Sequence, residues 1–463
     1  MQQIDSLLAS VKRVHFIGIG GAGMCPLAEI LHDWGYTVTG SDNNTGDNVD
    51  HLRELGIDVT IGQKAENLAG AELIVYTAAI LSDNPELVAA KAGEIPAVER
   101  AVLFGAITRR YGNCIAVCGT HGKTTVTAML TQVLVLADAD PTAVIGGVLP
   151  LIGSHGLSGK SDTMVCEACE FHDHYLELSP DVSVILNVDE DHLEYFKNLD
   201  NIIASFRKFA SLTSRTLIYN GDDANTCRAV EGVEKEKITF GFDPANDYSP
   251  ANLTFNRGAF AEFDVVFRAK AIAHLKLNIP GRHNVLNALA VFAAARHAGL
   301  EIAQIESGVA AFAGAGRRFE ILGEADGVTV ADDYAHHPSE LAVTLTAAMQ
   351  MGYRKVWAVF QPFTYSRTKI LFDDFVRVLQ IPDQCVMTEI MGSRERNTYG
   401  IYTKDLAEKI PGAVWFEGFD GVSKYTVAHA QKGDLIITLG CGDIYKAAKM
   451  MLKMLKEKST GNS

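Results

Sequence analysis

The sequence lacks the features that mark a membrane protein or a secreted protein. None of its apolar runs approaches the ~20 residues that a membrane-spanning helix needs. The N-terminus, Met-Gln-Gln-Ile-Asp-Ser, has neither the basic segment nor the apolar segment of a signal peptide. We therefore expect a cytoplasmic protein without membrane insertion.

Positive charge is also scarce. The 41 Lys and Arg residues are outnumbered by 56 Asp and Glu residues, which gives a formal net charge of −15. A general nucleic-acid binder shows a basic stripe, and none is present, so no nucleic-acid partner is expected. An anionic substrate has to be captured by local loops and a few basic side chains, because the overall field of the protein repels it.

Cysteine is present in small number and in the wrong pattern for a metal site. Of the eight cysteines, only Cys166 and Cys169 have the C-x-x-C spacing of a zinc or redox half-site. No second pair of matching spacing exists, and both residues fall in the pattern of a buried strand. Reduced thiols in a cytosolic protein are the expectation.

The length of 463 residues predicts three domains at ~150 residues each. Short apolar strands alternate with helices from the start, as in strand 13–18, helix 24–34 and strand 37–42, and this alternation predicts an α/β fold with mainly parallel sheets. The pattern restarts at Asn113 and again near Phe319. We therefore predict domains at 1–108, 109–316 and 317–463, and an antiparallel subdomain within 219–279.

A first glycine loop, Gly18-Ile-Gly-Gly-Ala-Gly23, follows a predicted strand and opens a helix. Asp42 ends the next strand, which completes the fingerprint of a dinucleotide-binding turn. This pattern predicts a pyrophosphate at the helix N-terminus and a diol near Asp42. Both a nicotinamide dinucleotide and a UDP-sugar offer these two groups.

A second glycine loop, Gly119-Thr-His-Gly-Lys-Thr-Thr125, follows the apolar run 113–118. It is shorter than the standard G-x-x-x-x-G-K-[ST] loop, since Val117 stands where the first glycine is needed. Its glycines still allow backbone N–H groups to surround phosphate oxygens at a helix N-terminus. Lys123 is placed to reach the β and γ phosphates, and the Thr124 hydroxyl to bind Mg²⁺.

Acidic residues follow two other predicted strands of the central domain. Glu167 ends the strand 163–168, and the strand 182–188 runs into Asp-Glu-Asp-His192. The carboxyl ends of parallel strands share one edge of a sheet, so these groups are candidates for a Mg²⁺ site beside the second loop. Solvated acidic turns are the alternative.

The third predicted domain carries two polar motifs at strand ends. They are Asp332-Asp-Tyr-Ala-His-His-Pro338 and Gln361-Pro-Phe-Thr-Tyr-Ser-Arg-Thr368. Ordinary turn chemistry could account for each motif alone.

Taken in order, these motifs resemble those of the Mur ligases, and the likeness extends from about residue 11 to 450. The same order also includes Glu167-Ala-Cys-Glu170, Asn187-x-x-x-Asp-His192, Gly281-Arg-His-Asn-Val-Leu-Asn287 and Gly316-Arg-Arg318. The resemblance implies a Rossmann-like first domain, a central P-loop ATPase-like domain with an antiparallel subdomain, and a Rossmann-like third domain that closes on ATP and binds the amino acid.

The resemblance also implies which residues form the sites. For the UDP-sugar these are Gly18, Gly20, Gly21, Gly23, Met24 and Asp42. For ATP they are Gly119, Thr120, His121, Gly122, Lys123, Thr124, Thr125, His283, Asn284, Asn287, Arg318 and Asp333. Mg²⁺ is assigned to Thr124, Glu167 and His192, the amino acid to His336 and Arg367, and catalysis to Lys123, Glu167, His192 and Arg318.

The activity implied is ATP-dependent ligation of L-alanine to the lactyl carboxylate of UDP-N-acetylmuramate through an acyl phosphate, by a monomer or a homodimer. A recycling ligase of the same family, which attaches an intact tripeptide, is an alternative. So are a nicotinamide-dependent oxidoreductase fused to an ATP-binding module and a nucleotide sensor without activity.

The sequence departs from the family pattern at two places. Cys169 stands where the family often has Asp, which removes one acid near the metal. Phe363 and Thr364 stand where relatives commonly have His or Arg. Because these two residues precede Arg367, the preference for L-alanine over glycine or L-serine stays open.

Overall fold

The structure, a computed structural model, describes residues 2–77, 80–256, 258–393 and 395–461. The chain divides into two compact units. Unit 1 comprises residues 1–251, 264–274 and 286–311, and unit 2 comprises 252–263, 275–285 and 312–463. The limits predicted at residues 108 and 316 stay predictions.

The N-terminal sheet has the strand order β3-β2-β1-β4-β5, and all of its neighbouring strands pair in parallel. Its strands are β1 (Arg13–Ile17), β2 (Thr37–Asp42), β3 (Asp58–Ile61), β4 (Leu73–Tyr76) and β5 (Ala97–Glu99). The helices here are α1 (Gln2–Ser10), α2 (Cys25–Asp33), α3 (Asp47–Glu54), η1 (Ala65–Leu68), α4 (Pro85–Ala92) and α5 (Arg100–Thr108).

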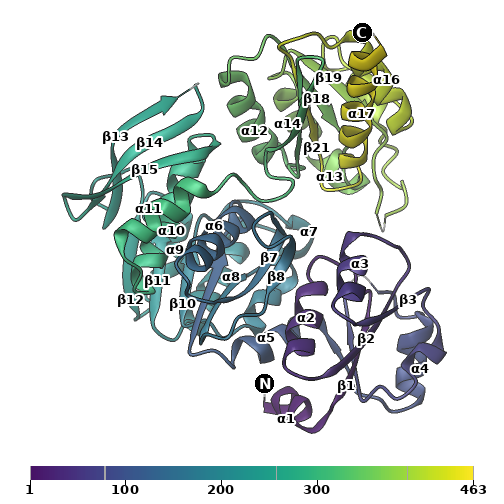
Figure 1. Ribbon diagram of the computed structural model, residues 1–463, viewed down its shortest axis with the longest axis vertical. Coiled ribbons are helices and arrows are strands. Elements are labelled where there is room, and N and C mark those ends of the chain that lie inside the picture. The colour runs from purple at the N-terminus through teal and green to yellow at the C-terminus, as the bar shows by residue number, and fades with distance from the viewer. Residues whose placement is uncertain (1, 78–79, 257, 394, 462–463) are drawn as a thin grey trace. The chain divides into compact units, whose positions relative to one another are not determined.

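Both faces of this sheet are covered by helices (Figure 1). Alternate side chains of a strand point to opposite faces. In β4, Leu73 and Val75 belong to one apolar cluster and Ile74 to another. Burial on both faces explains the continuous apolar runs in the sequence and confirms the predicted α/β architecture.

The central sheet has the order β15-β14-β13-β12-β11-β10-β6-β9-β7-β8. Its strands are β6 (Asn113–Cys118), β7 (Thr142–Leu149), β8 (Ser154–Leu157), β9 (Thr163–Glu167), β10 (Val182–Ile185), β11 (Thr216–Asn220), β12 (Glu236–Phe240), β13 (Tyr248–Asn256), β14 (Phe260–Phe267) and β15 (Lys270–Pro280). The helices are α6 (Lys123–Leu136), η2 (Phe171–Glu177), α7 (Leu193–Phe196), α8 (Leu199–Leu212), α9 (Ala224–Val230), α10 (His283–His297) and α11 (Ile302–Ala311).

Strand β6 lies between β10 and β9 and pairs in parallel with both. The carboxyl ends of these three strands therefore share an edge, as expected for Glu167 and for the segment after β10. The prediction of an antiparallel subdomain within 219–279 was wrong for its first part. Strands β11 and β12 pair in parallel, so the chain from Thr216 to Phe240 continues the parallel sheet. Strands β7 and β8 form an antiparallel pair that the sequence did not indicate.

The third sheet has the order β16-β17-β21-β18-β19-β20, in which only the β16–β17 pair is antiparallel among the described residues. Its strands are β16 (Glu320–Ala325), β17 (Val328–Asp333), β18 (Val356–Phe360), β19 (Gln384–Thr388), β20 (Val414–Phe416) and β21 (Leu435–Leu439). The helices are α12 (Pro338–Gln350), α13 (Tyr365–Ile370), α14 (Phe372–Val378), α15 (Thr403–Ala407), α16 (Phe419–His429) and α17 (Tyr445–Gly461).

This sheet is also buried on both faces. In β18, Ala358 and Phe360 belong to one apolar cluster, and Trp357 and Val359 to the other. The pattern explains the apolar run at 356–360 and matches the predicted doubly wound layer.

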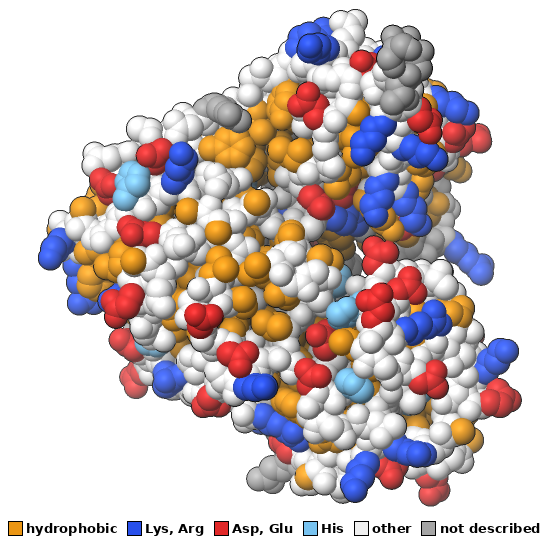
Figure 2. Space-filling model, viewed as in Figure 1, with side chains coloured by type: hydrophobic (Ala, Val, Ile, Leu, Met, Phe, Trp, Pro, Cys, Tyr) orange, Lys and Arg blue, Asp and Glu red, His pale blue; other side chains and the backbone are white. Residues whose placement is uncertain are grey.

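The surface carries charge of both signs. Figure 2 shows acidic and basic side chains scattered over the face that it presents, with hydrophobic side chains between them. Across the described residues, no helix combines the length and the apolar character that crossing a bilayer requires.

Asp333 fixes the backbone around the end of β17. Its carboxylate accepts hydrogen bonds from the N–H groups of Phe319 and Ala335, both at 2.7 Å. The side chain is buried, and burial raises the pKa of Asp333 to about 6, although Arg318 and the two N–H donors act in the opposite direction. The neutral acid is therefore favoured in the folded protein relative to the unfolded chain.

This shift predicts a pH-dependent stability difference between the wild-type protein and Asp333→Asn. An acid with a raised pKa contributes stability that is present below its unfolded pKa and is lost as the pH rises through its folded pKa. The wild-type free energy of unfolding should fall relative to that of the variant by up to about 3 kcal/mol between pH 4 and pH 6. Urea unfolding of both proteins across this range tests it, and parallel pH profiles would contradict it.

Candidate active site

The first glycine loop follows β1 and leads into α2. The N–H of Gly18 donates to the carbonyl of Ser41 at 2.8 Å, which ties the loop to the end of β2. Gly20 has no room for a side chain, because a Cβ there would lie 2.8 Å from Cγ2 of Val49. The loop is therefore tied to the sheet at Gly18 and packed against α3 at Gly20, a close approach of the kind that a pyrophosphate-binding turn requires.

Asp42 belongs to the same loop structure. Its carboxylate accepts hydrogen bonds from the N–H groups of Gly20 and Asn44, each at 3.0 Å. The N–H groups of Met24 and Cys25 both donate to the carbonyl of Gly21, at 2.8 and 2.9 Å, and so begin the first turn of α2. The structure thus brings the predicted residues of this loop together at one helix N-terminus.

The second glycine loop lies between β6 and α6. Gly119 and Gly122 adopt φ angles of 143° and 88°, a backbone region that side chains disfavour. A Cβ on Gly122 would also lie 2.9 Å from the side-chain oxygen of Asn287 on α10. The loop therefore needs both glycines, and Asn287 lies beside it; its contact with ATP stays a prediction.

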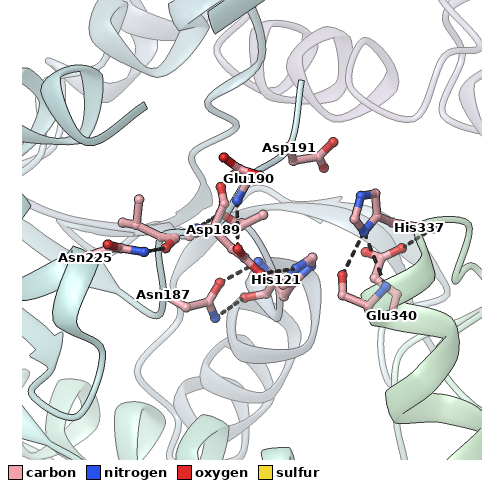
Figure 3. A network of polar contacts seen from close by, with 12 residues as sticks. His121, Asn187, Asp189, Glu190, Asp191, Asn225, His337 and Glu340 are labelled. Carbon is pink, nitrogen blue, oxygen red and sulfur yellow. Dashed lines mark hydrogen bonds and ion pairs between the residues drawn. The ribbon is translucent and has the colours of Figure 1, made fainter. Parts of the chain in front are cut away.

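Asn187, which follows β10, braces this loop (Figure 3). Its side-chain oxygen accepts from the N–H of His121 at 2.8 Å, and its amide nitrogen donates to the carbonyl of His121 at 3.0 Å. The carbonyl of Asn187 accepts from the N–H of Thr120 at 3.1 Å. Next along the chain, the N–H of Asp189 donates to the Thr120 hydroxyl at 2.9 Å.

Lys123, the first residue of α6, directs its side-chain ammonium back to the backbone of the glycine loop. The ammonium donates to the carbonyls of Gly119 and Thr120 at 2.6 and 3.1 Å and forms an ion pair with Glu170 at 2.9 Å. Burial lowers the pKa of Lys123, but the neighbouring Glu170, Cys169 and Glu167 together outweigh burial, and the pKa is raised above its usual range. The side chain therefore stays charged.

Glu167 and Thr124 meet on the other side of the loop. The Thr124 hydroxyl donates to the Glu167 carboxylate at 2.9 Å, and the N–H of Gly146 on β7 donates to the same oxygen at 2.9 Å. A Cβ on Gly146 would lie 2.4 Å from that carboxylate. A hydroxyl and a carboxylate at this position are the oxygen ligands that Mg²⁺ prefers.

His192 is held at the start of α7 in the left-handed region, at φ 52°. Its N–H donates to Asp191 at 2.7 Å, and its ring lies 4.6 Å from that of Phe171, measured between centroids. Within the described residues, no group of three or more His, Cys, Asp or Glu side chains is arranged to hold a metal ion. The role of His192 as a metal ligand stays a prediction.

The remaining predicted residues lie in unit 2, apart from Asn287 and Thr125. In that unit, Arg318 lies over the Tyr334 ring at 5.3 Å from its centroid. His283 begins α10 and packs against Gly281, while the Asn284 amide donates to the carbonyl of Pro280 at 2.8 Å.

His336 lies just before α12. Glu340 accepts from the N–H groups of His336 and His337 at 3.1 and 3.3 Å, and His337 caps the helix (Figure 3). The His336 ring contacts that of Phe363 with a centroid distance of 6.3 Å. The backbone at Phe363 and Thr364 pairs with Met391. Thr364 caps α13, where its hydroxyl accepts from the N–H of Arg367 at 3.4 Å.

Sequence reasoning did not assign roles to Asn187, Glu170 or Gly146. The first two stand inside quoted motifs, and the position of Asn187 directly after an apolar strand was a usable signal. Gly146 gave none, because its contact with Glu167 depends on β7 being the neighbour of β9.

Three family profiles match the chain, and together they span most of it. They are described as Mur ligase family, catalytic domain (residues 13–112), Mur ligase middle domain (117–295), and Mur ligase, glutamate ligase domain (317–442).

Similar proteins extend this match over nearly the whole length. UDP-N-acetylmuramate–L-alanine ligase of Caldanaerobacter subterraneus subsp. tengcongensis is 42% identical, over 97% of this chain and 99% of that protein. The protein of the same name from Agathobacter rectalis is 43% identical, over 95% and 97%. The crystal structure of the UDP-N-acetylmuramate–alanine ligase from Thermotoga maritima has a TM-score of 0.84 at 29% identity and covers 96% of this chain and 99% of that one.

A murein peptide ligase from Psychrobacter arcticus shares the fold, with a TM-score of 0.76 at 24% identity over 96% of this chain and 99% of that one. Family profiles over three successive segments and relatives above 40% identity over the full length lead to one conclusion. The chain belongs to the Mur ligase family.

Proposed function

We propose that this chain ligates L-alanine to the lactyl carboxylate of UDP-N-acetylmuramate, using Mg²⁺-ATP. The names of the relatives at 42% and 43% identity support this reaction. The observation that supports it in the structure is that one chain has two glycine loops, each leading into a helix, and that the second loop carries Lys123 and the Thr124–Glu167 pair. We interpret both loops as phosphate cradles. The first loop fits a nucleotide that is bound without reacting at its phosphates, and the second loop fits a nucleotide whose phosphoryl group is transferred.

The first loop would hold the diphosphate of the sugar nucleotide. Gly20 brings the backbone close to the sheet, and the helix N-terminus of α2 favours an anion. The Asp42 carboxylate, fixed by the N–H groups of Gly20 and Asn44, would accept hydrogen bonds from the hydroxyls of the nucleoside. Nothing in this loop supplies a reacting group.

The second loop would hold the phosphates of ATP, and Thr124 and Glu167 would hold Mg²⁺. Their oxygen atoms and the absence of a side chain at Gly146 fit a hard cation that keeps several waters. When bound, the cation neutralises charge on the phosphate oxygens. Lys123, charged and oriented by Glu170, adds a second positive charge at the same loop.

The reaction requires activation because a carboxylate carbon is a poor electrophile. Transfer of the γ-phosphoryl group from ATP to the lactyl carboxylate gives an acyl phosphate and ADP. The amine of L-alanine then attacks the acyl carbon, the amide bond forms, and inorganic phosphate leaves. Lys123 stabilises the negative charge that builds up on the transferring phosphoryl group, and Arg318, from unit 2, is proposed to do the same.

The first prediction concerns the acceptor. Phosphate release with Mg²⁺-ATP and UDP-N-acetylmuramate should require L-alanine, and mass spectrometry should find a product heavier by one alanyl residue. Parallel reactions with glycine and L-serine measure the selectivity that Phe363 and Thr364 leave open. Release with the recycling tripeptide alone would favour the murein peptide ligase activity instead.

The second prediction separates the two cradles. Lys123→Ala should lower turnover by about 100-fold or more, because a charge that stabilises the transferring phosphoryl group is lost. Calorimetry should find UDP-N-acetylmuramate binding largely unchanged. Lys208→Ala, which alters an exposed lysine on α8, is the control and should leave both quantities intact. Equal loss of binding and turnover in Lys123→Ala would refute this division.

The third prediction concerns Mg²⁺. Glu167→Gln removes a charged ligand, so the Mg²⁺ concentration for half-maximal rate should rise by at least the ~10-fold that even outer partners of a metal cost. Glu234→Gln, at an exposed position, is the control. An unchanged Mg²⁺ dependence in Glu167→Gln would exclude Glu167 as a metal ligand.

A further inference from the structure

Arg100 lies at a position that is electrostatically unfavourable for a positive charge. It is the first residue of α5, where the helix dipole disfavours a cation, and its side chain is only partly exposed. Burial lowers the pKa of Arg100, and the nearby Cys169, Glu167 and Glu99 offset part of this effect. A guanidinium has five N–H donors and stays charged, so such a position calls for an acceptor.

The protein itself supplies none. Among the described residues, the Arg100 guanidinium makes no hydrogen bond and no ion pair. Arg109, at the other end of the same helix, differs from Arg100 in this respect. It is the C-terminal cap of α5 and donates to Asp5 through Nε and Nη2, with an ion-pair distance of 2.9 Å. Arg109 thus makes a structural ion pair, whereas Arg100 makes none among the described residues.

The guanidinium lies at the first glycine loop. A Cβ built on Gly23 would lie 3.3 Å from Nη1 and 3.4 Å from Cζ of Arg100. Gly23 is the third glycine of the loop, two residues before α2 begins. The missing side chain at Gly23 therefore leaves room for the guanidinium beside the backbone of the glycine loop, just before the N-terminus of α2.

We propose that Arg100 binds the diphosphate of the sugar nucleotide. A side chain from α5 would then complete the phosphate-binding site formed by the first glycine loop. The planar guanidinium donates two parallel hydrogen bonds to phosphate oxygens, a geometry that an ammonium cannot reproduce. The inference rests on the proposed function, because it takes the UDP-sugar as the ligand of this loop.

The test compares Arg100→Met, Arg100→Lys and the matched control Arg109→Met. Calorimetry measures the binding of UDP, UDP-N-acetylmuramate and ADP to the full chain, and thermal unfolding measures the stability without ligand. Arg100→Met should weaken UDP and UDP-N-acetylmuramate alike by about 10- to 100-fold, the usual loss for hydrogen bonds to charged groups. ADP binding should not change, and Arg100→Lys should recover only part of the loss.

Stability separates this role from a structural one. Arg100→Met removes a guanidinium that makes no hydrogen bond or ion pair among the described residues, so the Tm without ligand should stay equal or rise. Arg109→Met breaks an ion pair and should lower the Tm while leaving UDP binding intact. Unchanged UDP affinity in Arg100→Met would overturn the inference, as would a lowered Tm with ADP binding lost as well. Loss confined to UDP-N-acetylmuramate would place Arg100 at the sugar or lactyl group instead. A wild-type protein that binds neither uridine nucleotide would refute the proposed function itself.

Discussion

The second cradle depends on one bridge between two strand ends. Asn187, leaving β10, holds both backbone groups of His121 and accepts from the N–H of Thr120, so a loop that follows β6 is tied to the neighbouring strand. Two glycines with positive φ make the turn possible, but glycine alone leaves the backbone free. The side-chain amide removes that freedom, and Lys123 and Thr124 at the start of α6 are positioned as a result.

Both glycine loops could be predicted from local sequence pattern. The spacing of Gly18, Gly20 and Gly23 and the run from Gly119 to Thr125 predicted both loops, and the apolar runs at 13–18 and 37–42 predicted parallel strands. These features depend on neighbours in the chain and on elementary periodicity, so they could be predicted from residues alone.

Contacts that depend on strand order could not be predicted in this way. Glu170 pairs with Lys123 across 47 positions, and Gly146 meets Glu167 because β7 lies beside β9. The stretch 219–279 was expected to be antiparallel because of its many short strands and turns, and this was wrong for its first part. Helix α9 between β11 and β12 instead provides the crossover that parallel pairing requires. The charge state of Cys169 also depends on the fold: burial first, and then Glu170, raises the pKa of this thiol to about 11, so the thiol stays neutral at pH 7.

The ion pair between Lys123 and Glu170 has a consequence for selectivity among anions. In the ligand-free chain the ammonium already has a carboxylate and two carbonyl oxygens as partners. A lone inorganic phosphate has to compete with these partners while offering few contacts of its own. A nucleoside triphosphate engages the whole loop at once and compensates for the exchange. For the nucleoside triphosphate that we propose as the ligand of this loop, the internal counter-ion would therefore favour the larger anion over inorganic phosphate.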